Sequence, residues 1–145
     1  MEEFELPKLT KVLIVEDNDD SRELLCQLLD GAGLECRTAS TGTSALEMLH
    51  GFAPDVAILD VGLPEMDGFE LARRIRRDPA HAHTILIAVT GYGRASDHAA
   101  SREVGFDGHL VKPVNTTQLL SLLSSIQNGD AVPTTLRAMP QPKRA

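Results

Sequence analysis

Short apolar runs alternate with amphipathic stretches along most of this chain. Three runs are continuous and rich in Val, Ile and Leu, which is typical of strands buried in a parallel sheet: residues 11–15, 56–60 and 84–89. Two weaker strand candidates cover residues 34–39 and 107–111. The pattern therefore predicts five strands, each separated from the next by a segment long enough for a helix.

The segments that follow the strands repeat their apolar residues at the spacing of one helix face. They predict helices over residues 19–30, 43–50, 68–77 and 116–126. The first helix has four leucines on the face that we expect to pack on the sheet: Leu24, Leu25, Leu28 and Leu29. Residues 95–104 carry only a thin apolar face, so we expect a helix there to be the most loosely anchored one.

Strands that alternate with helices predict an α/β fold, a doubly wound parallel sheet with right-handed crossovers and helices on both faces. One domain is expected, since 145 residues with 42% hydrophobic content can bury one substantial core. We place it at residues 11–126, between an N-terminal extension (1–10) and a C-terminal tail (127–145) that we expect to be flexible. The tail is too short for an output domain of its own.

Composition narrows the choice of partners and compartment. A formal net charge of −7 disfavours direct binding of nucleic acid, which rests on Lys and Arg neutralising the phosphate backbone. The longest apolar stretches have about six residues, whereas about 20 are needed to span a bilayer, and the N-terminus is acidic rather than basic. We therefore expect a cytoplasmic protein without membrane insertion, in which Cys26 and Cys36 are reduced.

A run of four arginines marks the third predicted helix: Arg73, Arg74, Arg76 and Arg77. They spread over most faces of the helix instead of forming one stripe. We interpret them as solvated charge rather than as a binding patch.

Chemically active side chains lie where four of the predicted strands end. Glu16 and Asp17 follow the first strand, Asp60 ends the third, Thr90 follows the fourth and Lys112 follows the fifth. The carboxyl ends of parallel strands meet at one edge of a sheet, so these groups can share a pocket. Three carboxylates repel one another unless a divalent cation joins them, and a lysine and a hydroxyl suit a phosphoryl oxygen. The arrangement predicts an aspartate that accepts a phosphoryl group.

Four motifs, in this order, resemble the receiver domain of two-component response regulators, the CheY-like family: KVLIVEDN, ILDVGLPEMDG, AVTGYG and HLVKPV. The resemblance covers residues 11–126 and implies a flavodoxin-like (βα)5 fold with strand order 2-1-3-4-5. It also implies that a histidine kinase or a histidine phosphotransfer protein donates the phosphoryl group. Phosphorylation would then switch a surface, made by the fourth helix, fifth strand and fifth helix, toward a downstream protein.

The resemblance assigns the acidic residues to a Mg²⁺ site. Asp60 would be both phosphoacceptor and metal ligand, Asp17 would bind the ion directly, and Glu16 would bind it through water. The backbone carbonyl of Gly62 would supply another ligand. A hard Mg²⁺ ion prefers oxygen ligands and usually keeps several waters, so a site with few carboxylates suits it.

Thr90 and Lys112 match the residues that receive the phosphoryl group in this family. The Thr90 hydroxyl would bond the group once it is attached, and Lys112 would pair first with Asp60 and then with the phosphoryl oxygens. The peptide bond between Lys112 and Pro113 would be cis. Because no substrate other than its own aspartate is implied, the protein would act in signalling and catalyse only its own phosphorylation and dephosphorylation.

Three positions set this chain apart within the family pattern. His109 stands where many receivers have a Tyr or Phe that rotates inward on activation, and it brings a group that titrates near neutral pH to the switch. Gly62 and Tyr92 stand where the family tunes the lifetime of the acyl phosphate. We expect Gly62 to offer no side chain that orients water, and Tyr92 to shield the site in part.

Other functions remain open at this point. The chain could be the C-terminal receiver of a hybrid histidine kinase that passes its phosphate to a histidine phosphotransfer protein. A metal-dependent phosphohydrolase of the haloacid-dehalogenase type is disfavoured, since such enzymes need a second Asp two residues after the nucleophile and this chain has Gly62 there. A binding module that keeps the fold without being phosphorylated is the third alternative.

Overall fold

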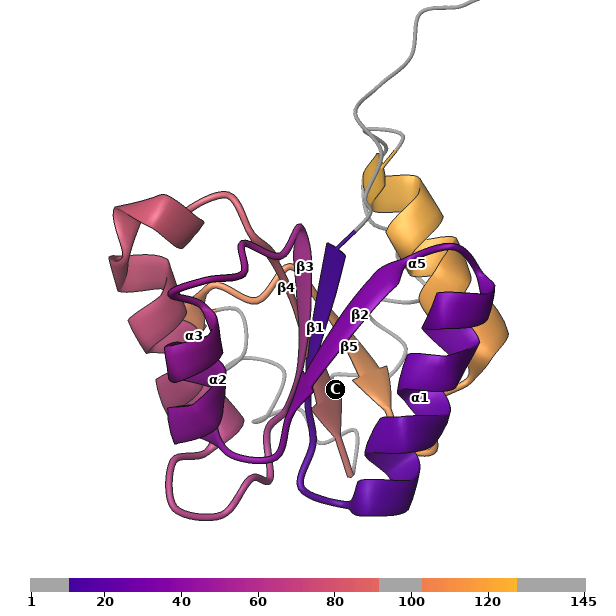
Figure 1. The fold of residues 1–145 in the computed structure, drawn as a ribbon, viewed down its shortest axis with the longest axis horizontal. Coiled ribbons are helices and arrows are strands. Elements are labelled where there is room, and N and C mark those ends of the chain that lie inside the picture. Colours follow the sequence, from indigo (N-terminus) through magenta and orange to yellow (C-terminus); the bar gives the residue numbers. More distant parts are fainter. Residues whose placement is uncertain (1–10, 92–102, 128–145) are drawn as a thin grey trace, which may run out of the picture.

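The computed structural model describes residues 11–91 and 103–127, which form a parallel sheet flanked by helices (Figure 1). Its elements are, in chain order, β1 (Lys11–Val15), α1 (Asp19–Gly31), β2 (Glu35–Ala39), α2 (Gly42–Met48), β3 (Val56–Asp60), α3 (Gly68–Arg77), a short 3-10 helix (Pro79–His81), β4 (Ile85–Thr90), β5 (Gly108–Val111) and α5 (Thr116–Gln127). All strand pairs are parallel and the order is β2-β1-β3-β4-β5. The predicted fold class and strand order are therefore confirmed.

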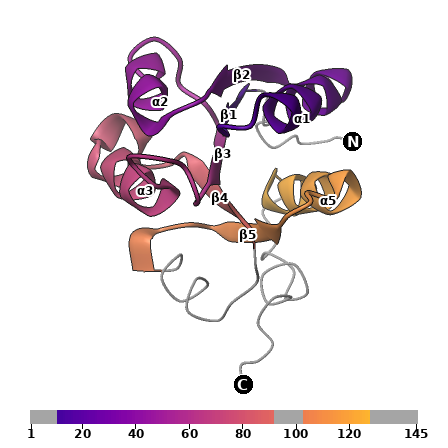
Figure 2. The same cartoon turned by 90° about the horizontal axis from the view of Figure 1, so that it is seen from below.

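Two hydrophobic cores lie on the two faces of the sheet. Figure 2 shows α2 and α3 on one face and α1 and α5 on the other. Alternate residues of each central strand enter opposite cores, as the period of two along a strand requires: Ala57 and Leu59 of β3 join the α2–α3 side, whereas Val56 and Ile58 join the α1–α5 side. Because β3 is buried along its whole length, its sequence is continuously apolar up to Asp60.

Side-chain caps start the helices within a few residues of the strand ends. The Asn18 side chain accepts a hydrogen bond from the Ser21 N–H (2.8 Å) at the start of α1. Thr41 and Ser44 cap α2 reciprocally, and Asp67 accepts from the Glu70 N–H at the start of α3. These short connections hold the residues that follow the strands close to the edge of the sheet.

The first helix departs from its predicted packing. Leu29 is fully buried and Leu25 is half-buried, but Leu24 and Leu28 are 58% and 39% exposed. The four leucines form a stripe too wide for one contact with the sheet, and the helix turns its Leu25–Leu29 side inward. The expectation that all four pack on the sheet was therefore wrong, and an apolar strip remains on the surface of α1.

Two further expectations have different outcomes. The helix predicted over residues 95–104 lies almost wholly outside the described residues, so its loose anchoring remains a prediction. Among the helices that the structure describes, none has the length and apolar character that crossing a membrane requires.

Arg76 joins three segments at the edge of the sheet opposite to the strand ends that carry the acidic residues. Its guanidinium donates to the carbonyl oxygens of Gly105 (2.7 and 3.1 Å) and Thr84 (2.6 Å) and to the Asp107 carboxylate (2.8 Å). Asp107 also accepts from the Leu86 N–H (2.9 Å). The sequence-based interpretation of this arginine as solvated charge was wrong, since it holds the segments that lead into β4 and β5.

We expect Arg76→Ala to destabilise the protein by about 2–4 kcal/mol, because several charge-assisted hydrogen bonds are lost and carbonyl groups are left without their donor. Arg77→Ala is the matched control, since Arg77 is exposed on the same helix, and it should change stability by less than about 0.5 kcal/mol. Chemical denaturation of both variants measures the two effects. Equal effects would contradict the role given to Arg76.

Candidate functional site

The ends of four parallel strands bring the predicted residues to one edge of the sheet. Glu16 and Asp17 follow β1, Asp60 ends β3, Thr90 ends β4 and Lys112 follows β5. Backbone hydrogen bonds continue between these ends, because the Lys112 N–H donates to the Thr90 carbonyl (2.8 Å). The residues come from positions up to 96 apart in the sequence, but the strand order places β1 and β4 on either side of β3.

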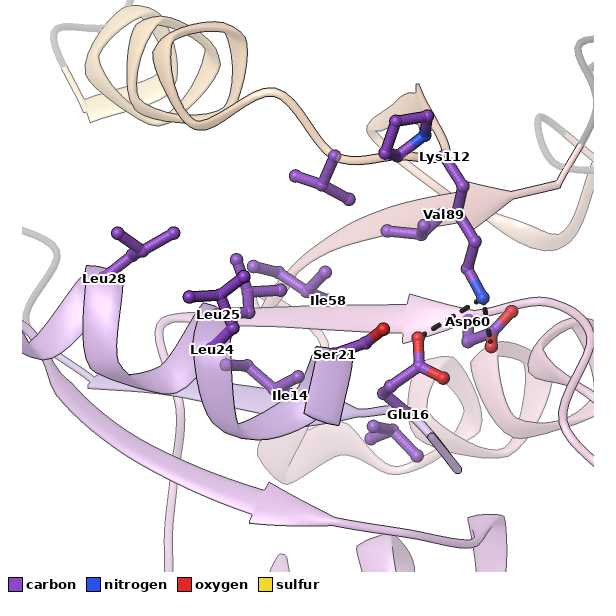
Figure 3. Close-up of a pocket in the computed structure, with 13 residues that line it drawn as sticks. Ile14, Glu16, Ser21, Leu24, Leu25, Leu28, Ile58, Asp60, Val89 and Lys112 are labelled. Atoms are coloured by element: carbon purple, nitrogen blue, oxygen red, sulfur yellow. Dashed lines mark hydrogen bonds and ion pairs between the residues drawn. The ribbon is translucent and has the colours of Figure 1, made fainter. Parts of the chain in front are cut away.

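Lys112 lies between two carboxylates. Its Nζ is 2.9 Å from Oδ2 of Asp60 and 3.3 Å from Oε1 of Glu16, and Figure 3 shows both interactions as dashed lines. Asp60 is 5% exposed and Glu16 is 7% exposed, so both carboxylates are largely removed from water. An ammonium group at this distance offsets part of the cost of burying them.

The second oxygen of Asp60 also has a donor. The Gly62 N–H donates to Oδ1 at 2.9 Å, so the carboxylate is oriented from both sides. The sequence predicted that the Gly62 carbonyl is a metal ligand, but it did not predict this N–H contact. A turn two residues after the end of the strand could have suggested it. The metal-ligand role of the Gly62 carbonyl remains a prediction.

Glu16 is held by one backbone donor and one side-chain donor that the sequence did not predict. Its Oε2 accepts from the Asn18 N–H at 2.9 Å. Its carbonyl oxygen accepts from the Arg22 guanidinium at 3.0 Å, which ties the acidic segment to α1. The only signal in the sequence is Asn18 itself, a preferred residue at a helix start.

Three carboxylates gather in a geometry that can hold a cation. One oxygen each of Glu16, Asp17 and Asp60 lie within 4.8 Å of one another, and among the described residues this is the group of metal-ligating side chains that meets that distance. Asp17 is exposed, which leaves one side open to water. All donors are oxygens and the open side accommodates retained waters, so the site fits a hard ion such as Mg²⁺.

Burial and charge shift the pKa values of two site residues. Burial raises the pKa of Glu16, and the charge of Asp60 raises it further, whereas the Asn18 N–H and Lys112 act to lower it. Burial acts to lower the pKa of Lys112, but the hydrogen bonds and charges of Asp60 and Glu16 outweigh it, so this pKa is raised. The cluster therefore holds its lysine charged and disfavours the ionised form of Glu16.

Gly68 allows the start of α3 to approach Asp60 closely. A Cβ at this position would lie 2.6 Å from the Asp60 carbonyl oxygen and 2.7 Å from the Val61 Cα. Backbone atoms cannot move aside easily, so residue 68 has to be a glycine for this packing. A Cβ at Gly62 would be 3.5 Å from Asp60 Oδ1, an ordinary contact.

The residues expected to form the switch share one face of the sheet. Thr90 and His109 are buried, at 1% and 4% exposure. In the register of β4 and β5, Ala88 pairs with His109 and Thr90 pairs with Val111, so both side chains are on the side of the α2–α3 core. The Lys112–Pro113 peptide bond is cis. Tyr92 lies outside the described residues, and its shielding role remains a prediction.

Comparison with known proteins agrees with this geometry. The family model of the response regulator receiver domain matches residues 12–124. The chain belongs to the response regulator receiver family. Its relatives include the polar-differentiation response regulator DivK of Brucella anthropi, which is 30% identical over 126 residues that cover 87% of this chain and all of DivK.

Solved receivers have the same fold. The chemotaxis response regulator CheY4 of Vibrio cholerae matches with a TM-score of 0.77 and 33% identity, over 82% of this chain and 99% of CheY4. The receiver domain of a signal transduction histidine kinase from Syntrophus aciditrophicus matches with a TM-score of 0.76 and 31% identity, over 83% of this chain and 91% of that one. A chemotaxis response regulator and the receiver domain of a histidine kinase thus both resemble this receiver.

We expect Glu16→Gln to stabilise the receiver at neutral pH when a chelator removes divalent cations. The folded-state pKa of Glu16 is raised, so the wild type loses stability as pH rises from the ordinary glutamate pKa of 4.5 through the folded value, whereas the variant does not. The gain should be present at pH 7 and absent near pH 4. Denaturation across this pH range measures it.

Glu23→Gln serves as the control, because it removes the same charge from an exposed position on α1 and should leave stability within about 0.5 kcal/mol of the wild type. A Glu16→Gln protein that is less stable than the wild type at pH 7 would show that pairing with Lys112 outweighs the cost of burying the carboxylate.

Proposed function

We propose that Asp60 accepts a phosphoryl group from a phosphohistidine of a histidine kinase or a histidine phosphotransfer protein. The observation that carries this proposal is the position of Asp60, whose carboxylate is 2.9 Å from the Lys112 ammonium and beside the acidic residues Glu16 and Asp17. In the transfer, the P–N bond of the donor breaks and a P–O bond to Asp60 forms, and the leaving imidazole regains a proton.

Alignment and charge neutralisation are the main requirements of such a transfer, because its transition state is loose and leaves little covalent chemistry to the protein. The Gly62 N–H and Lys112 hold the two oxygens of Asp60 in a fixed orientation. Lys112 then stays charged beside the incoming phosphoryl oxygens, since its pKa is raised. Bound through Glu16, Asp17 and Asp60, with the Gly62 carbonyl as a further ligand, Mg²⁺ would supply additional positive charge.

Phosphorylation then biases a surface that recognises a downstream protein. In this proposal the Thr90 hydroxyl donates to the attached phosphoryl group, and His109, on the same face of the sheet, fills the space beside it. The switched surface contains β5 and α5, at the edge of the sheet. No direct contact with nucleic acid is part of this function.

A related function is a receiver within a hybrid histidine kinase, which would pass its phosphate on to a histidine phosphotransfer protein. The similarity to the receiver domain of the Syntrophus aciditrophicus kinase favours keeping this second candidate. Turnover of external phosphoesters is disfavoured, since Gly62 leaves no acid/base two residues after Asp60.

Incubation with Mg²⁺ and the small phosphodonor acetyl phosphate tests the acceptor directly. Intact mass spectrometry should show one added phosphoryl group on the wild type and none on Asp60→Asn, because the amide is not a nucleophile for this transfer. Asp55→Asn is the matched control and should still gain the phosphoryl group, since Asp55 lies at the other end of β3. Unchanged wild-type mass would favour a binding module without phosphorylation, and steady turnover of multiple phosphate substrates would favour the hydrolase.

We propose further that Gly62 and Tyr92 set the lifetime of the acyl phosphate. Gly62 offers no side chain to position an attacking water, and Tyr92 shields the phosphoryl group in part. A Tyr92→Ala protein should then lose phosphate several-fold faster than the wild type, as followed by intact mass after the donor is removed. Loss at the wild-type rate would contradict the shielding role.

A further inference from the structure

A groove runs along α1 from the acceptor site, on the face of the sheet that α1 and α5 cover. It has a volume of about 470 Å³, and Figure 3 shows Leu24, Leu25 and Leu28 of α1 along one wall. Pro113 and Val114 line the other wall, and the floor reaches Ile58 and Val89 of the sheet. Leu24 and Leu28 are the exposed large hydrophobic residues of the described part of the chain, and both belong to this groove.

One end of the groove is acidic. Glu16 and Asp60 line it, Asp17 lies beside them, and Lys112 is the one cation among its lining residues. Asp19 and Asp20 begin α1 at the same end. The groove is therefore apolar near Leu28 and negatively charged near Asp60, and a complementary occupant needs apolar residues followed by positive charge.

The C-terminal segment of this chain has that order of residues. Leu136 and Met139 come first, with Arg137 between them; Lys143 and Arg144 follow, and no acidic residue occurs after Asp130. The N-terminal segment, residues 1–10, is also apolar in part, but it carries Glu2, Glu3 and Glu5 against one lysine. Charge thus selects the C-terminal segment over the N-terminal one.

The direction of α5 and the length of the chain that follows it agree with this choice. Both α1 and α5 start at the acceptor edge and run away from it on the same face of the sheet, so their C-terminal ends point the same way (Figure 1). Residues 128–135 can span up to about 26 Å, ample to return to the groove. Leu136 and Met139 are about 9 Å apart in an extended proline-rich chain, and Leu24 and Leu28 are about 6 Å apart along α1, a difference that long, flexible side chains can accommodate.

We propose that residues 136–144 of the same chain occupy this groove, with Leu136 and Met139 against Leu28 and Leu24, and with Lys143 and Arg144 over the acidic end. The docked segment covers the approach to Asp60 from the α1 side. It therefore competes with any protein that docks there to phosphorylate Asp60; this consequence rests on the proposed function, whereas the docking itself does not.

Methyl NMR of the full chain tests the docking without any phosphodonor. Nuclear Overhauser cross-peaks should link the Met139 ε-methyl to the δ-methyls of Leu24 or Leu28. Leu24→Ser should remove these cross-peaks and shift the Met139 signal toward its position in a free peptide of residues 128–145. Unchanged methyl signals of Leu59 and Leu86, which lie in the core on the other face of the sheet, show that the variant keeps its fold, as the exposure of Leu24 leads us to expect.

Charge reversal tests the polarity of the docked segment. The double variant Lys143→Glu, Arg144→Glu should weaken or abolish the cross-peaks, and so should raising the salt concentration from 20 to 500 mM, because the attraction to the acidic end is screened. Arg77→Glu, which reverses a charge on α3 at the opposite face, should leave them unchanged.

Three results would overturn the proposal. The Met139 methyl could have free-peptide shifts in the wild type, the groove leucines could contact residues 1–10 instead, or the cross-peaks could arise only between differently labelled copies in a mixed sample. The last result would assign the groove to a second copy of the chain. A wild type that docks its tail, together with an undocked Leu24→Ser variant that gains no phosphoryl group from acetyl phosphate and Mg²⁺, would refute the proposed function and leave the docking intact.

Discussion

Repulsion among buried carboxylates is the constraint on which this receiver depends. Glu16 and Asp60 are both more than nine-tenths buried, and their oxygens lie within 4.8 Å of each other and of Asp17. Lys112 offsets part of this repulsion, while burial and, to a smaller extent, the charge of Asp60 still raise the pKa of Glu16. A site with this residual repulsion gains free energy from any added positive charge, which is the physical reason that it suits a cation and then a phosphoryl transfer.

The rest of the fold holds that cluster in place. Buried strands bring their ends to one edge, and helix caps such as Asn18 and Asp67 keep the following residues there. Gly68 lets α3 start against the Asp60 backbone. At the opposite edge, Arg76 hydrogen-bonds to the segments that enter β4 and β5. These contacts fix the start of β5 and so help to position Lys112 at its other end. The same strands thus carry stabilising contacts at one end and the residues of the acceptor site at the other.

Part of the apolar face of α1 is left uncovered and lines the groove that leads to the acceptor site. A helix that buried all four of its leucines would close the groove, but Leu24 and Leu28 stay exposed beside the acidic cluster. Exposed apolar side chains next to concentrated negative charge favour an occupant with both apolar and basic residues. The sequence of the C-terminal segment supplies both within one chain, and in the proposed docking it covers part of the surface through which a protein partner reaches the site.

The alternation of strands and helices, the fold class and the strand-end residues could all be predicted from the amino-acid sequence. Buried parallel strands appear in the sequence as continuous apolar runs, and polar side chains mark their ends. The order of motifs also pointed to the family. Features that depend on packing between distant segments appear only in the folded structure. Lys112 contacts both Asp60 and Glu16, Arg76 hydrogen-bonds to the segments that precede β4 and β5, and α1 leaves two of its leucines exposed. Periodicity defines which face of a helix is apolar, but only the neighbouring elements decide how much of that face they cover.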